Sequence, residues 1–278
     1  MKIELQNILL LTQKEILDSQ RNRWFVLYTI IFAALSLGLS WFGLTGLGNY
    51  GLSGFGRTTA SMINLILLIV PLMGLTLGAI SLAGEREHGT LLYILAQPVD
   101  PIEVLTGKFM GVGIALLGAL ALGFGISGFM IAWYGGATHI GSYLGLVGLT
   151  FLLGLVTLGM GLLISSALSK ANTAVGVSLF FWLILVFFGD LGIMGTALIA
   201  KFDIQHLFYV SLLNPLQVFK IAAISILHSN LEILGPVGTY AIRTYGDHLL
   251  PLLVSILFAW VVITFLGTQW LFKRKGGI

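Results

Sequence analysis

The chain has 278 residues, of which 57% are hydrophobic and only 9% are charged, and its mean hydropathy is +1.01. One water-soluble core cannot bury so many apolar residues, so the composition excludes a soluble globular protein and predicts an integral membrane protein. The formal net charge of +3 reflects basic residues in the loops and is no sign of nucleic-acid binding.

Residues 1–23 are predicted to form an amphipathic helix that lies in the membrane surface. Apolar residues and one threonine recur at helical spacing along one face: Leu5, Ile8, Leu9, Thr12 and Ile16. A basic exit, Arg21-Asn22-Arg23, and then Trp24 form an interfacial anchor before the chain turns into the bilayer. A simple anchor and a mechanical role both fit this helix. No small-residue cleavage pattern follows it, so we expect no cleaved signal peptide.

Six stretches are long enough to cross a bilayer, because hydrocarbon about 30 Å thick needs about 20 apolar residues in a helix. They are residues 24–43, 60–83, 109–134, 143–168, 173–189 and 249–272, which predicts an all-α fold with six spans. No Asp, Glu, Lys, Arg or His lies within the apolar body of any of them. Ion-driven carriers keep such groups in the membrane at a cost of at least about 2.5–3.5 kcal/mol each, so a self-powered carrier is disfavoured. A sodium site built of carbonyls and hydroxyls stays open.

Small residues indicate where the spans pack. In the second span, Gly74 and Gly78 follow Pro71, which predicts a weak point that could serve as a hinge. In the third span, small residues recur every fourth position: Gly111, Ala115, Ala119, Gly123 and Ser127. Such a stripe permits close helix approach, and it fits packing within the chain, a dimer seam or a substrate wall.

A charged run interrupts the apolar chain in the loop predicted at residues 84–108. Glu85, Arg86, Glu87 and His88 are predicted to form the first turn of a short helix. Gly89 loosens that helix, residues 90–96 give it an apolar face, and prolines 98 and 101 end it. The pattern fits either a plug for a groove on a partner or a solvated loop.

The longest loop, residues 200–248, lies between the fifth and sixth spans and is predicted to be partly helical. Residues 218–227 are apolar but too short to cross, which is typical of a re-entrant or interfacial helix. Asn214 is predicted to cap that helix, with Pro215 as its first residue. Lys220 and Glu232 are rim charges that either contact an extracytoplasmic partner or are simply solvated.

Basic residues orient the chain, since cytoplasmic loops retain Lys and Arg. With both termini inside, only Arg57, Lys201, Lys220 and Arg243 of the 14 basic residues lie outside. The charged run is then cytoplasmic and the loop at 200–248 extracytoplasmic.

Several kinds of chemistry have no pattern in this sequence. There is no phosphate-binding G-x-x-x-x-G-K-[ST] string, and no arrangement typical of a hydrolase. The chain has no cysteine, and its five histidines are scattered, so we predict no metal site and no cofactor of its own. Energy for any transport is therefore expected to enter through another subunit.

At this point the chain resembles the ABC-2 type transporter permeases. The matching motif reads Glu-Arg-Glu-His-Gly-Thr-Leu-Leu at residues 85–92, followed by Gln97-Pro98-Val99 and Leu105-Thr106-Gly107-Lys108. Together with the surface helix and the six spans, the resemblance covers essentially the whole chain. More narrowly, residues 14–18, 21–24 and 214–220 are similar to permeases of transporters that serve maturation of nitrous oxide reductase, a copper enzyme.

The family resemblance implies a single transmembrane domain, residues 1–278, that dimerises with a second copy of itself. Two cytoplasmic ABC ATPase subunits would bind ATP and magnesium, and this chain would be a non-catalytic subunit in the inner membrane. Residues 1–23 would be the elbow helix, and residues 85–95 the coupling helix seated in an ATPase groove. The residues that would contact the ATPase are Glu85, Arg86, Glu87, His88, Gly89, Thr90, Leu91 and Leu92.

The narrower resemblance implies further partners. A periplasmic β-helical protein would dock on the outer loop, at Asn214, Pro215, Lys220 and Glu232. A copper-carrying lipoprotein chaperone would join a complex that supports assembly of the copper centres. Two other functions stay open: export of a drug, lipid or polysaccharide, and anchoring of a periplasmic protein without transport.

Overall fold

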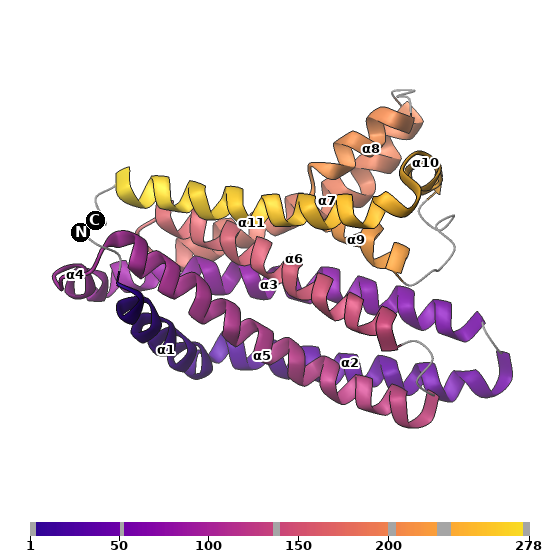
Figure 1. The fold of residues 1–278 in the computed structure, drawn as a ribbon, viewed down its shortest axis with the longest axis horizontal. Helices are drawn as coiled ribbons and strands as arrows, with labels where there is room; N and C mark the ends of the chain where they lie inside the picture. The colour runs from indigo at the N-terminus through magenta and orange to yellow at the C-terminus, as the bar shows by residue number, and fades with distance from the viewer. Residues whose placement is uncertain (1–3, 51–52, 136–139, 200–203, 227–234, 275–278) are drawn as a thin grey trace.

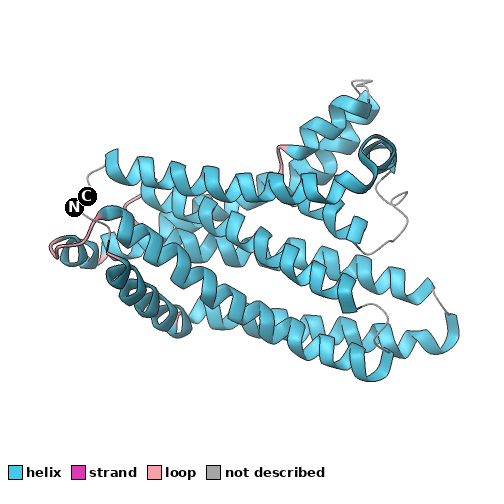
Figure 2. Cartoon of the chain, in the orientation of Figure 1, coloured by secondary structure: helices cyan, strands magenta, loops and turns pink. Residues whose placement is uncertain are grey.

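The protein is an elongated bundle of long helices joined by short loops (Figure 1; Figure 2). The computed structural model describes residues 4–50, 53–135, 140–199, 204–226 and 235–274. Within these ranges the regular secondary structure is entirely helical.

Six helices in the described part of the chain are long and apolar enough to cross a membrane. They are α2 (Arg23–Tyr50), α3 (Ser53–Glu87), α5 (Pro101–Gly135), α6 (Ile140–Ala167), α7 (Ala171–Ile199) and α11 (Leu249–Arg274). The six predicted spans are therefore confirmed. Most of these helices continue beyond their apolar stretch, because hydropathy marks only the part that can lie in lipid and not the place where helical backbone ends.

Shorter helices lie at the two ends of the bundle. At one end are α1 (Leu5–Arg21) and α4 (Thr90–Leu95), at the same end as the last turn of α11 (Figure 1). Toward the other end are α8 (Ile204–Leu212), α9 (Pro215–Ile226), α10 (Gly235–Tyr245) and the 3-10 turn η3 (Gly246–His248). The shared end of α1, α4 and α11 agrees with the prediction that the charged run and both ends of the chain lie on one side.

The segment between α7 and α11 folds partly back into the bundle. α8 and α9 meet at an angle of 108°, which is the geometry of a broken span or a re-entrant loop. Asn214 caps α9 by accepting a hydrogen bond from the Leu216 amide at 3.0 Å, and Pro215 is its first residue, as predicted. Nine of the 12 residues of α9 are buried, so this helix is part of the core.

A seam of glycines brings α3 and α6 together. A Cβ atom on Gly78 would lie 2.5 Å from the Leu158 carbonyl oxygen and 2.7 Å from the Leu162 amide nitrogen. Gly161 faces the same crossing from α6, where its Cβ would lie 3.0 Å from the Gly78 Cα. Backbones approach this closely only where side chains are absent. α3 runs unbroken through Pro71, and the hinge proposed there stays a prediction.

The small-residue stripe of α5 packs against α1 and α2 of the same chain. A Cβ on Gly111 would lie 2.5 Å from the Glu15 Cβ, and one on Gly123 would lie 2.6 Å from the Phe32 ring. Ala115 and Ala119 between them are buried. The structure thus shows that the stripe packs against other helices of the same chain.

Hydroxyl groups extend that stripe toward the far end of α5. The Ser127 hydroxyl lies 2.9 Å from the Ser36 hydroxyl of α2 and 3.0 Å from the Tyr143 hydroxyl of α6. The Tyr143 hydroxyl in turn donates to the Phe124 carbonyl at 2.6 Å. Because lipid offers these groups no partner, the contacts set the register of the three helices.

Candidate coupling site

The helix α4 stands at the end of the bundle as a short, exposed element. Gly89 precedes it with φ 73°, a left-handed conformation that favours glycine and separates α4 from α3. Leu91 anchors α4 to the core and is only 1% exposed. On the outer side, Leu92 is 57% and Tyr93 is 81% exposed. Neighbouring apolar groups left in contact with solvent are typical of a surface that binds a partner.

The predicted start of this helix was wrong. Glu85, Arg86 and Glu87 form the last turn of α3, and the short helix begins at Thr90. The predicted loop at residues 84–108 is mostly helical, since α5 already begins at Pro101. The cause is Gly89, because a glycine in the left-handed conformation ends the preceding helix at the residues just before it.

The last turn of α3 is bonded to four other parts of the chain. Glu85 forms ion pairs with lysines of α1 and α5. An Arg86 Nη1 hydrogen donates to the Leu168 carbonyl at 2.7 Å, just beyond the last turn of α6. The Glu87 Oε2 accepts from the Ala171 amide at 2.8 Å, the first residue of α7. One turn of α3 therefore joins α1, α5, α6 and α7 beside α4.

Glu85 and Arg86 thus point into this chain, while Glu87, His88, Thr90 and Leu92 are exposed. The His88 Nδ1 donates to the Gly84 carbonyl at 2.7 Å, and the Thr90 hydroxyl donates to the Glu85 carbonyl at 3.2 Å. Of the predicted contact residues, the exposed ones remain available to an ATPase. Tyr93 was not among them, although it is the most exposed large apolar side chain of the site.

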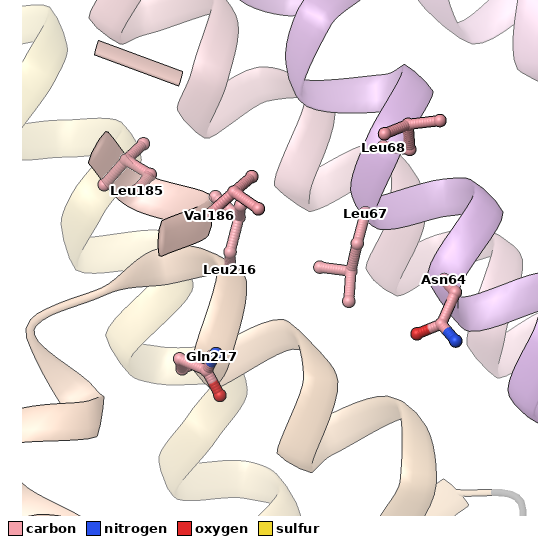
Figure 3. Close-up of a pocket in the computed structure, with 7 residues that line it drawn as sticks. All are labelled: Asn64, Leu67, Leu68, Leu185, Val186, Leu216 and Gln217. Atoms are coloured by element: carbon pink, nitrogen blue, oxygen red, sulfur yellow. The ribbon is translucent and has the colours of Figure 1, made fainter. Parts of the chain in front are cut away.

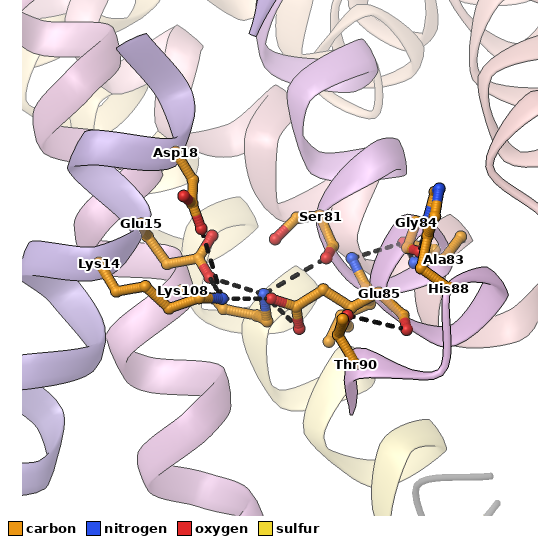
Figure 4. Close-up of polar contacts among 12 residues, drawn as sticks. Lys14, Glu15, Asp18, Ser81, Ala83, Gly84, Glu85, His88, Thr90 and Lys108 are labelled. Carbon is orange, nitrogen blue, oxygen red and sulfur yellow. Dashed lines mark hydrogen bonds and ion pairs between the residues drawn. The ribbon is translucent and has the colours of Figure 1, made fainter. Parts of the chain in front are cut away.

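A charge cluster made of Lys14, Glu15, Glu85 and Lys108 lies behind α4 (Figure 4). The Lys108 Nζ lies 2.7 Å from a Glu15 oxygen and 2.8 Å from a Glu85 oxygen. Lys14 closes the ring by pairing with both carboxylates, at 3.2 Å from Glu15. The Lys108 side chain is 1% and the Glu15 side chain 7% exposed, so these charges are shielded from water. Removing one partner from such a buried pair typically costs about 3–5 kcal/mol.

Lys14 is the member of the cluster that borders solvent. Partial burial tends to lower the pKa of its ammonium, but the carboxylates of Glu15 and Glu85 outweigh that effect and raise the pKa above its ordinary value. A raised pKa contributes stability that is complete below the unfolded value of about 10.4 and is lost only as the pH rises through the folded value. Lys14 is therefore charged throughout the physiological range.

A second polar junction ties the start of α1 to the start of α5. Asp100 and Glu103 form a capping box, with the Ile102 amide donating to Asp100 at 3.0 Å and the Asp100 amide donating to Glu103 at 3.1 Å. Glu103 also accepts from the Glu4 amide at 2.6 Å and from the Asn7 side chain at 3.0 Å. Helix α1 is thus bonded at two places along its length.

The residues predicted to bind an extracytoplasmic partner have different settings. Asn214 is half-buried, and its amide donates to the Leu185 carbonyl at 2.7 Å. Pro215 is buried in the core, so its side chain is not exposed for docking. Lys220 is half-buried, whereas Glu232 lies outside the described residues. Docking at these positions stays a prediction.

A cavity of 200 Å³ lies among α3, α7 and α9 (Figure 3). The amides of Asn64 and Gln217 face it, and its other described lining residues are four leucines and Val186. This lining offers hydrogen bonds but no charge to a molecule inside.

Comparison with known sequences decides the family. A sequence profile described as "ABC-2 family transporter protein" matches residues 9–276, which is nearly the whole chain. The chain belongs to the ABC-2 family of transporter proteins.

Two relatives within this family carry a more specific name. A protein of Pseudomonas aeruginosa is 31% identical over 221 residues, covering 77% of this chain and 80% of its own length. A protein of Stutzerimonas stutzeri is 28% identical over 271 residues, covering 95% of this chain and 97% of its own length. Both are described as "Probable ABC transporter permease protein NosY".

Membership of the ABC-2 family indicates the general role of this chain. It is a multi-pass membrane protein and the permease subunit of an ABC transporter, and a permease of this type implies an ATPase partner.

Proposed function

We propose that this chain is a NosY-like permease that converts ATP hydrolysis in a cytoplasmic ATPase dimer into motion of its spans and outer segment. That motion serves a periplasmic partner in maturation of the copper centres of nitrous oxide reductase. The observation that carries the proposal is the exposed apolar pair Leu92 and Tyr93 on α4. Helix α4 follows immediately after the last turn of α3, which is bonded to four other helices.

The proposed complex contains two copies of this chain in the inner membrane, with both termini cytoplasmic. A NosF-like ATPase dimer holds ATP and magnesium and receives α4 in a groove of each subunit. A NosD-like β-helical protein docks at the extracytoplasmic end, and a NosL-like copper chaperone delivers metal to the assembly. Catalysis and cofactor binding belong to the partners.

Physical chemistry favours α4 as the contact. Aromatic side chains that fill a pocket carry much of the binding free energy of interfaces, and Tyr93 is the aromatic residue of this helix. Leu91 holds α4 to the core, so a displacement of the exposed face reaches the end of α3. The contacts of Glu85, Arg86 and Glu87 then extend that displacement to α1, α5, α6 and α7.

The contact is tested by changing Tyr93→Ser. Loss of an aromatic side chain that the ATPase groove would bury should weaken binding of the co-encoded ATPase by about tenfold or more, since such residues contribute about 2 kcal/mol or more. Tyr209→Ser is the matched control, because Tyr209 is 46% exposed but lies on α8, toward the opposite end of the bundle. Pull-down of the ATPase from detergent-solubilised membranes measures the effect. Equal binding by the two variants would place the ATPase contact elsewhere.

The physiological role is tested in a strain that lacks its own permease of this type. Supplying this chain with its co-encoded partners should restore copper-loaded nitrous oxide reductase, measured by absorbance and activity of the purified enzyme. An ATPase subunit unable to hydrolyse ATP should abolish that restoration. Restoration with the inactive ATPase would instead support a membrane anchor, and accumulation of a drug, lipid or polysaccharide without any effect on the reductase would support an exporter.

A further inference from the structure

The side chains of α1 that are buried against the bundle are polar. Thr12, Glu15 and Ser19 are its buried residues. Its exposed face carries the leucines at positions 5, 9, 10 and 17. Its apolar contacts, such as that of Leu11 with Gly107 of α5, involve only half-buried side chains, so the position of α1 depends also on close backbone packing and on polar contacts.

Lys108 makes the central contact. A lysine ammonium has three N–H donors, and three oxygens surround this one: Glu15 at 2.7 Å, Glu85 at 2.8 Å and the Ser81 carbonyl at 3.3 Å. These oxygens belong to α1 and to the end of α3, while Lys108 itself is on α5 (Figure 4). Gly111, one turn further along α5, lets Glu15 approach within reach of the ammonium.

We propose that Lys108 is a positioning residue of the permease, which joins α1 to the turn of α3 before α4 so that the two move together. Helix α1 then follows α4 when the ATPase acts. The identity of the driving subunit rests on the proposed function, whereas the rigid joint rests only on the contacts of Lys108.

The charge cluster is better suited to holding α1 and α3 in fixed relative positions than to adding stability alone. A buried ion network adds little net stability compared with apolar packing of the same volume, but it fixes the relative position of the elements that supply its charges. Here three helices supply them, and each carboxylate forms ion pairs with both lysines. Translation of α1 along α3 would break several of these contacts at once.

The first test compares Lys108→Met with Lys273→Met, which removes the same charge from an exposed position at the end of α11. In the permease alone, reconstituted in nanodiscs, Lys108→Met should raise amide hydrogen exchange in α1, whereas Lys273→Met should not. In the full complex, Lys108→Met should leave ATPase binding intact. It should lower reductase maturation per ATP hydrolysed by about tenfold, which is within the range of measured coupling effects. Lys108→Arg, which keeps the charge, should recover part of this loss. Unchanged exchange in α1 would overturn the proposal.

The second test holds even if Lys108→Met accumulates poorly. Because the chain has no cysteine, Lys14→Cys with Glu85→Cys gives a pair that a reversible bifunctional thiol reagent can bridge. Without the reagent this variant should be uncoupled, since two cluster charges are gone. Bridging α1 to α3 should restore maturation, and cleavage of the bridge should remove it again. Full maturation without the bridge, or no recovery of maturation with it, would overturn the proposal. A failure of the proposed function appears separately, as Tyr93→Ser that binds the ATPase normally.

Discussion

Glu87 lies where the last turn of α3 meets the first residue of α7. Its carboxylate accepts the Ala171 amide hydrogen, one of the amides that has no partner within α7. It also places a negative charge at the positive end of that helix, a contact worth about 0.3–1 kcal/mol. The same side chain is exposed beside α4, so it is able to contact the ATPase as well.

Changing Glu87→Lys should therefore uncouple ATP hydrolysis from function or weaken ATPase binding. The substitution removes the acceptor and places a positive charge at a helix N-terminus, where it is unfavourable. Glu87→Gln keeps an acceptor oxygen and is the matched control. ATPase activity and reductase maturation, measured on the purified complex, should both be near normal in Glu87→Gln. Normal assembly and maturation in Glu87→Lys would show that this residue has no role in coupling.

At the scale of the helices, the backbones of α3 and α6 approach each other so closely at their crossing that there is no room for a Cβ atom on Gly78 or Gly161. Gly78→Ala should destabilise the permease by about 1–3 kcal/mol, because the new methyl group would clash with backbone atoms of α6, which can move only if the whole helix shifts. Gly118→Ala on α5 is the control, since nothing lies within 4 Å of its Cβ position. That change should be neutral or stabilise the helix by up to about 1 kcal/mol. Thermal unfolding in detergent distinguishes the two, and equal melting temperatures would contradict the seam.

The orientation of the whole molecule is open to a direct measurement. Because the chain has no cysteine, Tyr93→Cys and Asp247→Cys each provide a single exposed thiol, one on α4 and one in η3. In intact cells a membrane-impermeant maleimide should label the thiol at position 247 but not the one at position 93. Permeabilised cells should label both. The reverse pattern would place α4 outside and would remove it from reach of a cytoplasmic ATPase.

Local patterns predicted the spans and the start of α9, because apolar length and an Asn-Pro cap are written in consecutive residues. The capping box of Asp100 and Glu103 is equally local and was a signal available in the sequence. So was Gly89, a residue typical of a helix end, which would have placed the boundary of α3 at Glu87.

The charge cluster could not be predicted in the same way. Lys108 and Glu15 are 93 residues apart, and only the crossing of α1 over Gly111 brings them together. The spacing of the apolar residues of α1 likewise does not show which residues contact the bundle, where Thr12 of the predicted apolar face is buried. Glu15 can be buried there because Lys108 pairs with it.

The continuity of α3 has a mechanical consequence for the whole molecule. Its 35 residues form a rod about 52 Å long at 1.5 Å per residue. If the rod pivots near Gly78, where it crosses α6, its two ends swing in opposite directions, and a tilt of about 5° moves the near end at Glu87 by about 1 Å and the far end at Ser53 by about 3 Å. A shift of that size at the end of a packed helix is comparable to those that switch subunit interfaces. A small rotation beside α4 is thus delivered, reversed in direction, to the far side of the bilayer.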